Sequence, residues 1–241
     1  MSSQETISQK VTLSGLSGLS GLLDKGIEDW VFDLDNTIYP AKSNLFARVA
    51  QKMTDFLMVE FKLEEPEAAA LKTRLFREYG TTMHGLMQEF GMESGPFLSY
   101  VHDIDLSDVS PDSELDSLLG QLPGRKHIFT NGTVAHAENI LGAFGVRSHF
   151  DFIFDIIGAN HEPKPAMRPY EIFLSQSGIN PANAVMIEDM AVNLRAPAAL
   201  GMGTIWIEHD YEWAKQGSDE DYVQYKSADI KSCLREILGK S

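Results

Sequence analysis

The chain has 241 residues, of which 35 are acidic and 20 are basic, and its formal net charge is −15. This balance excludes polymeric nucleic acid as an expected partner, because phosphate backbones are bound by clustered Lys and Arg. We also expect no membrane partner, since no apolar run approaches the roughly 18 residues that a spanning helix needs.

The first 25 residues contain a Ser/Gly/Leu repeat, LSGLSGLSGLL, and we expect a flexible tail (1–25), with docking of its leucines as the alternative. Residues 29–35 (DWVFDLD) predict a short buried strand that ends in carboxylates. Residues 42–110 then predict helices only, because apolar residues recur with a helical period and Pro66 suits a first helical position. We interpret 42–110 as an inserted helical cap.

From residue 111 the pattern alternates between strands and helices, with strands predicted at KHIFTNG, FDFIFDII, AVMIED and TIWIEH. Such alternation implies parallel crossovers, so we expect an α/β fold with a doubly wound parallel sheet, formed by residues 26–41 and 111–241. The single cysteine, Cys233, is interpreted as a packing residue of a final amphipathic helix. Because one cysteine permits no intrachain disulfide, we expect a cytoplasmic protein.

Polar clusters follow the predicted strands, at the ends where open parallel sheets bind ligands. The motif D-L-D-N-T places Asp33 and Asp35 close together, and two such carboxylates can divide nucleophilic attack and proton transfer between them. The motif I-F-T-N-G offers the Thr130 hydroxyl and turn amides to a phosphoryl oxygen. Taken alone, each motif has an alternative: two aspartates that cap a turn, and an ordinary Thr-Asn-Gly turn.

Two further motifs carry charge. Lys164, between prolines in E-P-K-P, is suited to phosphate binding, although an exposed loop lysine is the alternative. Glu188 and Asp189 end the strand of M-I-E-D-M-A-V-N and, with Asp33, supply the oxygen ligands that Mg²⁺ prefers. Asn193 is placed to orient them. A helix N-cap is the alternative for Asp189.

Taken together and in this order, the four motifs resemble those of the haloacid dehalogenase superfamily over about residues 29–210. The resemblance implies a Rossmann-like core, an inserted cap and a Mg²⁺-dependent phosphomonoesterase that forms an aspartyl-phosphate on Asp33. It implies that Asp35 protonates the leaving oxygen and then activates water. It also implies that Thr130 and Asn131 bind the phosphoryl group and that Lys164 offsets negative charge.

The same resemblance implies that Mg²⁺ is held by Asp33, the backbone carbonyl of Asp35, Asp189, and Glu188 either directly or through water. Asp35 also bears on the type of reaction, because dehalogenases of the superfamily generally lack an aspartate at this position. Phosphoryl transfer is therefore favoured over dehalogenation. A phosphomutase and a non-catalytic binding module remain alternatives.

For the substrate, F-D-L-D-N-T-I-Y-P and F-R-E-Y-G-T-T-M-H-G-L resemble the pyrimidine 5′-nucleotidase branch, which implies UMP or CMP as the small phosphorylated metabolite. Tyr79, Thr81, Thr82 and His84 are the candidate substrate-specificity residues. Alternatively, Tyr79 belongs to an apolar helical stripe, and the two threonines begin the next helix. A sugar phosphate or another small phosphometabolite is the alternative substrate. We interpret the other histidines as surface or packing residues.

Overall fold

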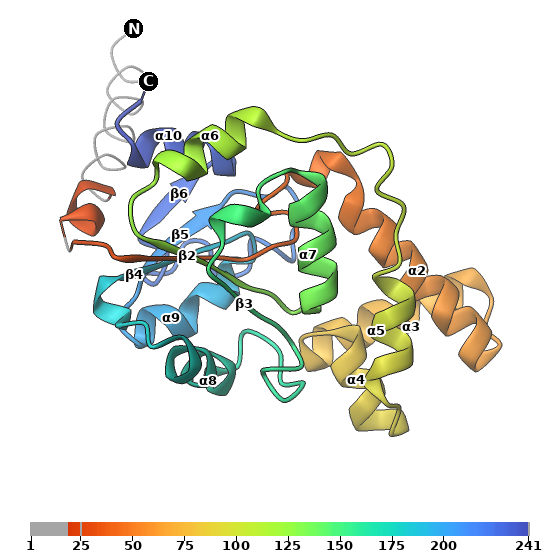
Figure 1. Ribbon diagram of the computed structural model, residues 1–241. Coiled ribbons are helices and arrows are strands. Elements are labelled where there is room, and N and C mark those ends of the chain that lie inside the picture. The colour runs from red at the N-terminus through yellow and green to blue at the C-terminus, as the bar shows by residue number, and fades with distance from the viewer. Residues whose placement is uncertain (1–18, 25, 241) are drawn as a thin grey trace, which may run out of the picture.

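The computed structural model describes residues 19–24 and 26–240. Within these residues the chain forms a six-stranded sheet of order β3-β2-β1-β4-β5-β6, and every neighbouring pair is parallel. The strands are β1 (Asp29–Phe32), β2 (Arg125–Phe129), β3 (Phe152–Phe154), β4 (Ala184–Glu188), β5 (Gly203–Ile207) and β6 (Tyr225–Ser227). The predicted α/β fold with a doubly wound parallel sheet is confirmed (Figure 1).

The strand order reverses at β1. The chain runs from β1 outward through β2 to β3, and then returns to β4, which pairs with the other side of β1. Asp33 continues this pairing beyond the strand, because its backbone N–H donates to the Ile187 carbonyl at 2.9 Å. In open α/β sheets, ligands bind beyond the carboxyl ends of the strands at such a reversal. The fold therefore places Asp33 at the expected binding position.

Helices cover both faces of the sheet (Figure 1). Trp30 and Phe32 of β1 belong to one buried cluster, and Val31 belongs to the other, as the two-residue period of a strand requires. On the first face lie α6 (Ser113–Gln121), α7 (Val134–Ala143) and α10 (Ile230–Ile237). On the second face lie α8 (Met167–Ser177) and α9 (Arg195–Ala199). Strands buried on both faces explain the nearly continuous apolar runs in the sequence.

Between β1 and α6 the chain is helical, with α2 (Leu45–Phe61), α3 (Glu65–Tyr79), α4 (Thr82–Phe90) and α5 (Ser94–Val101) following the short 3-10 turn η1 (Ala41–Ser43). These helices enclose a buried apolar cluster of their own, and Ile156 from the segment after β3 completes it. A capping box between Glu64 and Glu67 begins α3. The four helices lie to one side of the sheet, at the right of Figure 1. We refer to them as the cap.

Several details differ from the prediction. The first strand ends at Phe32 and not at residue 35, because the chain turns at Asn36, whose φ is 60°. Strand β6 was not predicted, since YKS lacks an apolar run. Most of the predicted flexible tail lies outside the described residues. Its residues 19–23 are helical, and Leu19 and Leu22 are buried in the core.

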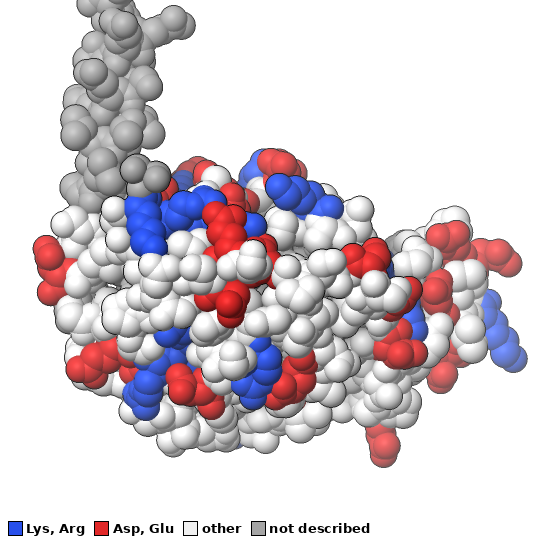
Figure 2. All heavy atoms as spheres, turned by 45° about the horizontal axis from the view of Figure 1, so that its top comes forward, with Lys and Arg blue, Asp and Glu red and all other residues white. Residues whose placement is uncertain are grey.

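The outer surface beside α6 and α10 carries paired charges. Lys231 Nζ lies 2.9 Å from Asp112, and Arg235 pairs with Glu114. Figure 2 shows basic and acidic side chains interspersed on the face that includes these helices. None of the helices that the structure describes has the length and apolarity that a membrane crossing requires.

Substitution of Gly124, which precedes β2, tests the close approach between the backbones that lead into β1 and β2. Its φ is +89°, and an added Cβ would lie 2.5 Å from the Glu28 carbonyl oxygen. Gly91 has φ +64° but nothing within 4 Å of an added Cβ. We expect Gly91→Ala to cost about 1 kcal/mol and Gly124→Ala about 3 kcal/mol, because only the second adds a backbone clash to the left-handed strain. Urea denaturation of both variants measures this, and equal losses would contradict it.

Candidate active site

A buried ammonium group lies at the carboxyl end of the sheet. Lys164 Nζ donates to Asp33 Oδ1 at 2.6 Å, to Glu188 Oε2 at 3.0 Å and to the Phe129 carbonyl at 2.9 Å. The three acceptors follow or end β1, β4 and β2. The Lys164 side chain is only 1% exposed, so the alternative of an exposed loop lysine is wrong. Lys164 thus joins the three central strands at one point.

Three carboxylates surround this point. Asp33, Glu188 and Asp189 are buried, and each contributes an oxygen to a group whose members all lie within 4.8 Å of one another. Burial, followed by repulsion from Asp33, raises the pKa of Glu188 to about 8. Burial and the neighbouring carboxylates likewise raise the pKa of Asp189. Burial lowers the pKa of Lys164, but attraction to Asp33 and Glu188 outweighs it and the net pKa is raised.

This cluster fits a divalent cation. Among the described residues, one ammonium faces three carboxylates, which leaves an excess of buried negative charge. Asp189 Oδ2 is buried and has no hydrogen-bond partner in the described part of the chain. An unpaired buried oxygen beside two other carboxylate oxygens is the donor set that Mg²⁺ prefers. The residues predicted from the sequence as side-chain metal ligands are therefore brought together.

Asn193 lies beside the cluster, as the sequence motif suggested. The side-chain amide of Asn193 donates to Glu188 Oε1, and the backbone carbonyl of Asn193 accepts from the Tyr170 hydroxyl at 2.7 Å. Asn193 sits in the 3-10 turn η4 (Ala191–Leu194) that follows β4. These contacts orient one oxygen of Glu188 while Lys164 binds the other. Asn193 therefore holds the glutamate in place.

Asp35 points into the same region from the turn after β1. Its Oδ1 accepts from the Tyr39 hydroxyl and lies 3.0 Å from His136 Nε2. Burial raises the pKa of Asp35, but attraction to His136 and hydrogen bonds from His136 and Tyr39 outweigh this, and the net pKa is lowered. Neither partner was predicted from the sequence. Interpreting His136 as a surface or packing residue overlooked its polar contact with Asp35.

The Thr-Asn-Gly turn links two of the motifs. Asn131 Oδ1 accepts from the Lys164 backbone N–H at 3.0 Å, so the turn holds the loop that carries the lysine. Thr130 is buried, and its Oγ1 accepts from the Gly132 N–H at 2.9 Å. The hydroxyl proton of Thr130 remains available to a ligand. This geometry agrees with a phosphoryl-binding turn as well as with a structural one.

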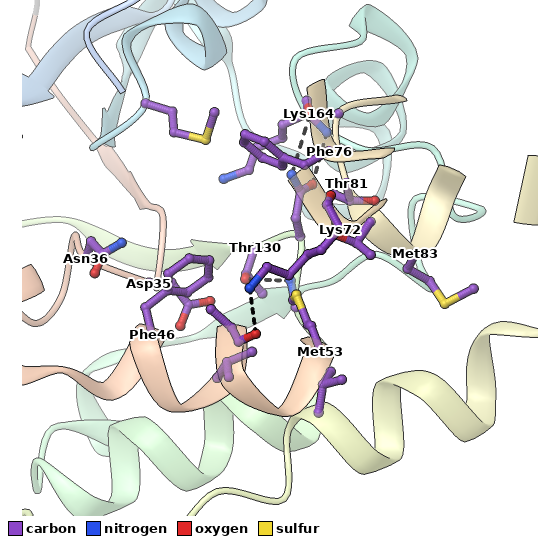
Figure 3. A pocket seen from close by; sticks show the side chains of 18 of the residues that line it. Asp35, Asn36, Phe46, Met53, Lys72, Phe76, Thr81, Met83, Thr130 and Lys164 are labelled. Atoms are coloured by element: carbon purple, nitrogen blue, oxygen red, sulfur yellow. Dashed lines mark hydrogen bonds between the residues drawn. The ribbon is translucent and has the colours of Figure 1, made fainter. Parts of the chain in front are cut away.

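A cavity of about 470 Å³ connects these residues to the cap. Figure 3 shows that Asp35, Thr130 and Lys164 from the core face Phe46, Lys72 and Phe76 from the cap across it. Lys72 Nζ donates to the Ala50 carbonyl at 2.9 Å and to Thr54 Oγ1 at 2.8 Å. Lys72 lies on the cap side of the cavity, burial lowers the pKa of its amino group, and it was not predicted from the sequence.

The four candidate specificity residues divide into two pairs. Thr81 and Thr82 line the cavity, whereas Tyr79 and His84 are absent from the described residues that line it. Thr81 also caps α4 by accepting from the His84 backbone N–H at 3.1 Å, and His84 Nδ1 lies 2.9 Å from the His161 carbonyl. The Tyr79 ring lies beside the His84 ring, with centroids 6.4 Å apart, so this pair belongs to the packing around α4. The two threonines are the pair that a ligand in the cavity can touch.

Comparison with known proteins identifies the family. A family model described as haloacid dehalogenase-like hydrolase matches residues 30–207, and the chain belongs to this family of hydrolases. A relative in Saccharomyces cerevisiae, Phosphate metabolism protein 8, is 28% identical over 226 residues, which cover 86% of this chain and 69% of the relative.

Solved structures share the fold. A HAD phosphatase from Thermococcus onnurineus superposes with a TM-score of 0.59 at 17% identity, over 89% of this chain and 99% of that one. An L-2-haloacid dehalogenase from Xanthobacter autotrophicus superposes with a TM-score of 0.56 at 14% identity, over 89% and 100%. Because enzymes of two reaction types share the fold this closely, the fold by itself does not decide the reaction.

Lys164→Met tests the charge balance of the site. Removal of the ammonium leaves Asp33 and Glu188 buried without their counter-charge, and we expect a loss of about 3–5 kcal/mol in the free energy of unfolding. Lys126→Met is the matched control, because Lys126 is also buried but its Nζ donates to the Gly124 carbonyl. We expect this control to cost about 1 kcal/mol. Urea denaturation in the presence of a chelator measures the free energy of unfolding of both variants. Equal losses would contradict the expected role of Lys164 as the counter-charge.

Proposed function

We propose that this protein is a phosphomonoesterase that forms an aspartyl-phosphate on Asp33. The observation that carries the proposal is the Asp33 carboxylate, held 2.6 Å from Lys164 Nζ within the carboxylate cluster and lining the cavity beside Asp35. A carboxylate nucleophile and a phosphate dianion repel each other. A buried cation beside the nucleophile offsets that repulsion and stabilises the charge that is transferred.

In the proposed first half-reaction, an Asp33 oxygen forms a bond to phosphorus while the bond from phosphorus to the leaving oxygen breaks. Asp35 gives its proton to that oxygen, and Thr130 donates to the phosphoryl group. In the second half-reaction, water attacks phosphorus, the bond to Asp33 breaks and Asp35 takes the proton from the water. The hydrogen-bonded position of Asp35 beside the cavity supports this division of roles.

We propose Mg²⁺ as the metal, with Asp33, Glu188 and Asp189 as the side chains that hold it together with the Asp35 carbonyl. When bound, Mg²⁺ supplies positive charge that neutralises the cluster and the phosphoryl oxygens. The buried, unpartnered Asp189 oxygen supports this assignment.

Asp35 favours phosphoryl transfer over dehalogenation. A halide leaves without a proton, whereas an alkoxide needs one, and Asp35 is held by two hydrogen-bonding groups next to the nucleophile. The name of the yeast relative, which refers to phosphate metabolism, is consistent with this proposal.

For the substrate we propose a pyrimidine nucleoside 5′-monophosphate such as UMP or CMP. The cavity volume of about 470 Å³ lies within the range of about 300–1,000 Å³ for small-molecule sites. Its cap side combines the aromatic rings of Phe46 and Phe76 with polar groups of Lys72, Thr81 and Thr82. Aromatic faces and hydrogen-bonding groups suit a base attached to the phosphate-bearing sugar. Sugar phosphates are the alternative substrates, and the cavity admits them as well.

Phosphate release from UMP, CMP, AMP, GMP and a series of sugar phosphates tests the reaction and the substrate together. We expect UMP or CMP to have the highest kcat/KM, and Asp33→Asn to lower it by at least about 10³-fold, because the nucleophile is removed. Asp219→Asn, an exposed aspartate that pairs with Lys226, is the control and is expected to be fully active. Preference for a sugar phosphate would contradict the proposed substrate but not the proposed mechanism. Full activity in Asp33→Asn would overturn the mechanism.

Thermal unfolding tests the metal without any substrate. We expect Mg²⁺ at 100 times its Kd to stabilise the wild type by about 2.7 kcal/mol, and Asp189→Asn to remove most of this gain. In the presence of a chelator we expect the reverse order, with Asp189→Asn at least as stable as the wild type, because one of three repelling carboxylates is gone. An Asp189→Asn variant that keeps the full Mg²⁺ stabilisation would contradict the assigned ligand.

A further inference from the structure

His136 is a buried histidine on α7 that contacts Asp35. His136 is 1% exposed. Its Nε2 lies 3.0 Å from Asp35 Oδ1, although 101 positions separate the two residues in the sequence. Oδ1 accepts in this contact both when the carboxyl group is ionised and when Oδ2 carries the proton, so the proton of the contact belongs to Nε2. The Tyr39 hydroxyl donates to the same Oδ1. Two donors from the described residues thus bind one oxygen of Asp35, and Oδ2 is the oxygen left to exchange a proton with a ligand.

The ring of His136 is itself held. His102 stacks on it with ring centroids 4.4 Å apart and an interplanar angle of 18°. Thr133 contacts both residues: its Oγ1 lies 3.1 Å from the His102 ring at Nδ1, and it caps α7 by accepting from the His136 backbone N–H at 3.2 Å. Burial, together with His136, lowers the pKa of His102 to about 3, so a neutral ring lies against His136.

His102 belongs to the end of the cap. It directly follows α5, the last cap helix, and it lines the cavity. The stack of His102 on His136 therefore connects the cap to the side chain that contacts Asp35.

We propose that His136 is a positioning residue for Asp35: it holds Oδ1 so that Oδ2 faces the leaving oxygen, and His102 keeps its ring in place. The inference rests on the proposed function, in which Asp35 is the general acid. Neither histidine touches the reacting atoms. Their effect passes through the orientation of one carboxyl group.

The leaving group provides a specific signature. A nucleoside or sugar alkoxide needs the proton from Asp35, whereas p-nitrophenolate leaves readily without it. The ratio kcat/KM covers the steps up to the first irreversible one, so in a two-step reaction it reports on departure of the leaving group. A misaligned Asp35 therefore lowers kcat/KM for UMP or a sugar phosphate more than for p-nitrophenyl phosphate. A general loss of folded protein would lower both equally.

The experiment compares the wild type with His136→Phe and His136→Gln, using p-nitrophenyl phosphate and the best alkyl monophosphate of the substrate panel. Phe keeps a ring for stacking and removes the donor, and we expect about a 10²-fold loss in kcat/KM for the alkyl substrate and less than about 5-fold for p-nitrophenyl phosphate. Gln restores an N–H donor, and we expect kcat/KM of His136→Gln for the alkyl substrate to be at least about 10-fold higher than that of His136→Phe. If His136→Phe does not fold, His102→Leu tests the same pattern, with an expected loss of about 10-fold for the alkyl substrate only.

Leu141→Ala is the matched control, because Leu141 is a fully buried residue of the same helix in the core cluster and lacks a polar contact to Asp35. We expect it to lower stability without a change in the ratio of the two activities. Equal losses on both substrates in His136→Phe, or no recovery in His136→Gln, would overturn the positioning role while the wild type stays active. A wild type that hydrolyses neither substrate, or that does so without Asp33, would overturn the proposed function and this inference with it.

Discussion

Lys164 Nζ, held between Asp33 and Glu188, is the contact on which the arrangement of the site depends. The ammonium binds groups from the ends of three neighbouring strands, and all three groups are buried. Charges taken out of water need close partners with good geometry, or they destabilise the fold. The same geometry brings together the proposed nucleophile, its counter-charge and the carboxylate oxygens proposed to bind the metal. Stability and chemistry therefore impose the same requirement on these residues.

The sheet and the cap make different contributions around this centre. The sheet fixes the ends of β1, β2 and β4 in register, which sets the relative positions of Asp33, Thr130 and Glu188 within a rigid frame. The cap contributes cavity-lining side chains such as Lys72, and through His102 it also reaches the partner of Asp35. The residues proposed to bind the phosphoryl group thus lie at the ends of the strands. The residues proposed to bind the rest of the ligand, and the partner of Asp35, lie where the sheet and the cap meet.

The parts of the fold and site that the sequence predicted are those coded locally. Apolar strands followed by carboxylates identified Asp33, Glu188 and Asp189, because a strand end and its polar turn are contiguous. The role of His136 was not predicted, because its contact with Asp35 depends on how α7 packs against the sheet. Lys72 was not predicted for a related reason. It lies in a helix with no motif, and only the packing of α3 against α2 places it at the cavity.

The cap also has a consequence for how the chain folds. Asp29 of β1 pairs with Arg125 of β2, so these two neighbouring strands must meet across a loop of more than ninety residues. The cap helices that fill most of this loop pack mainly on one another, around an apolar cluster of their own. Helices with local contacts form quickly, whereas long-range strand pairing is slow because loop closure costs entropy first. We expect early collapse of the cap to shorten the effective loop and so speed the formation of the sheet.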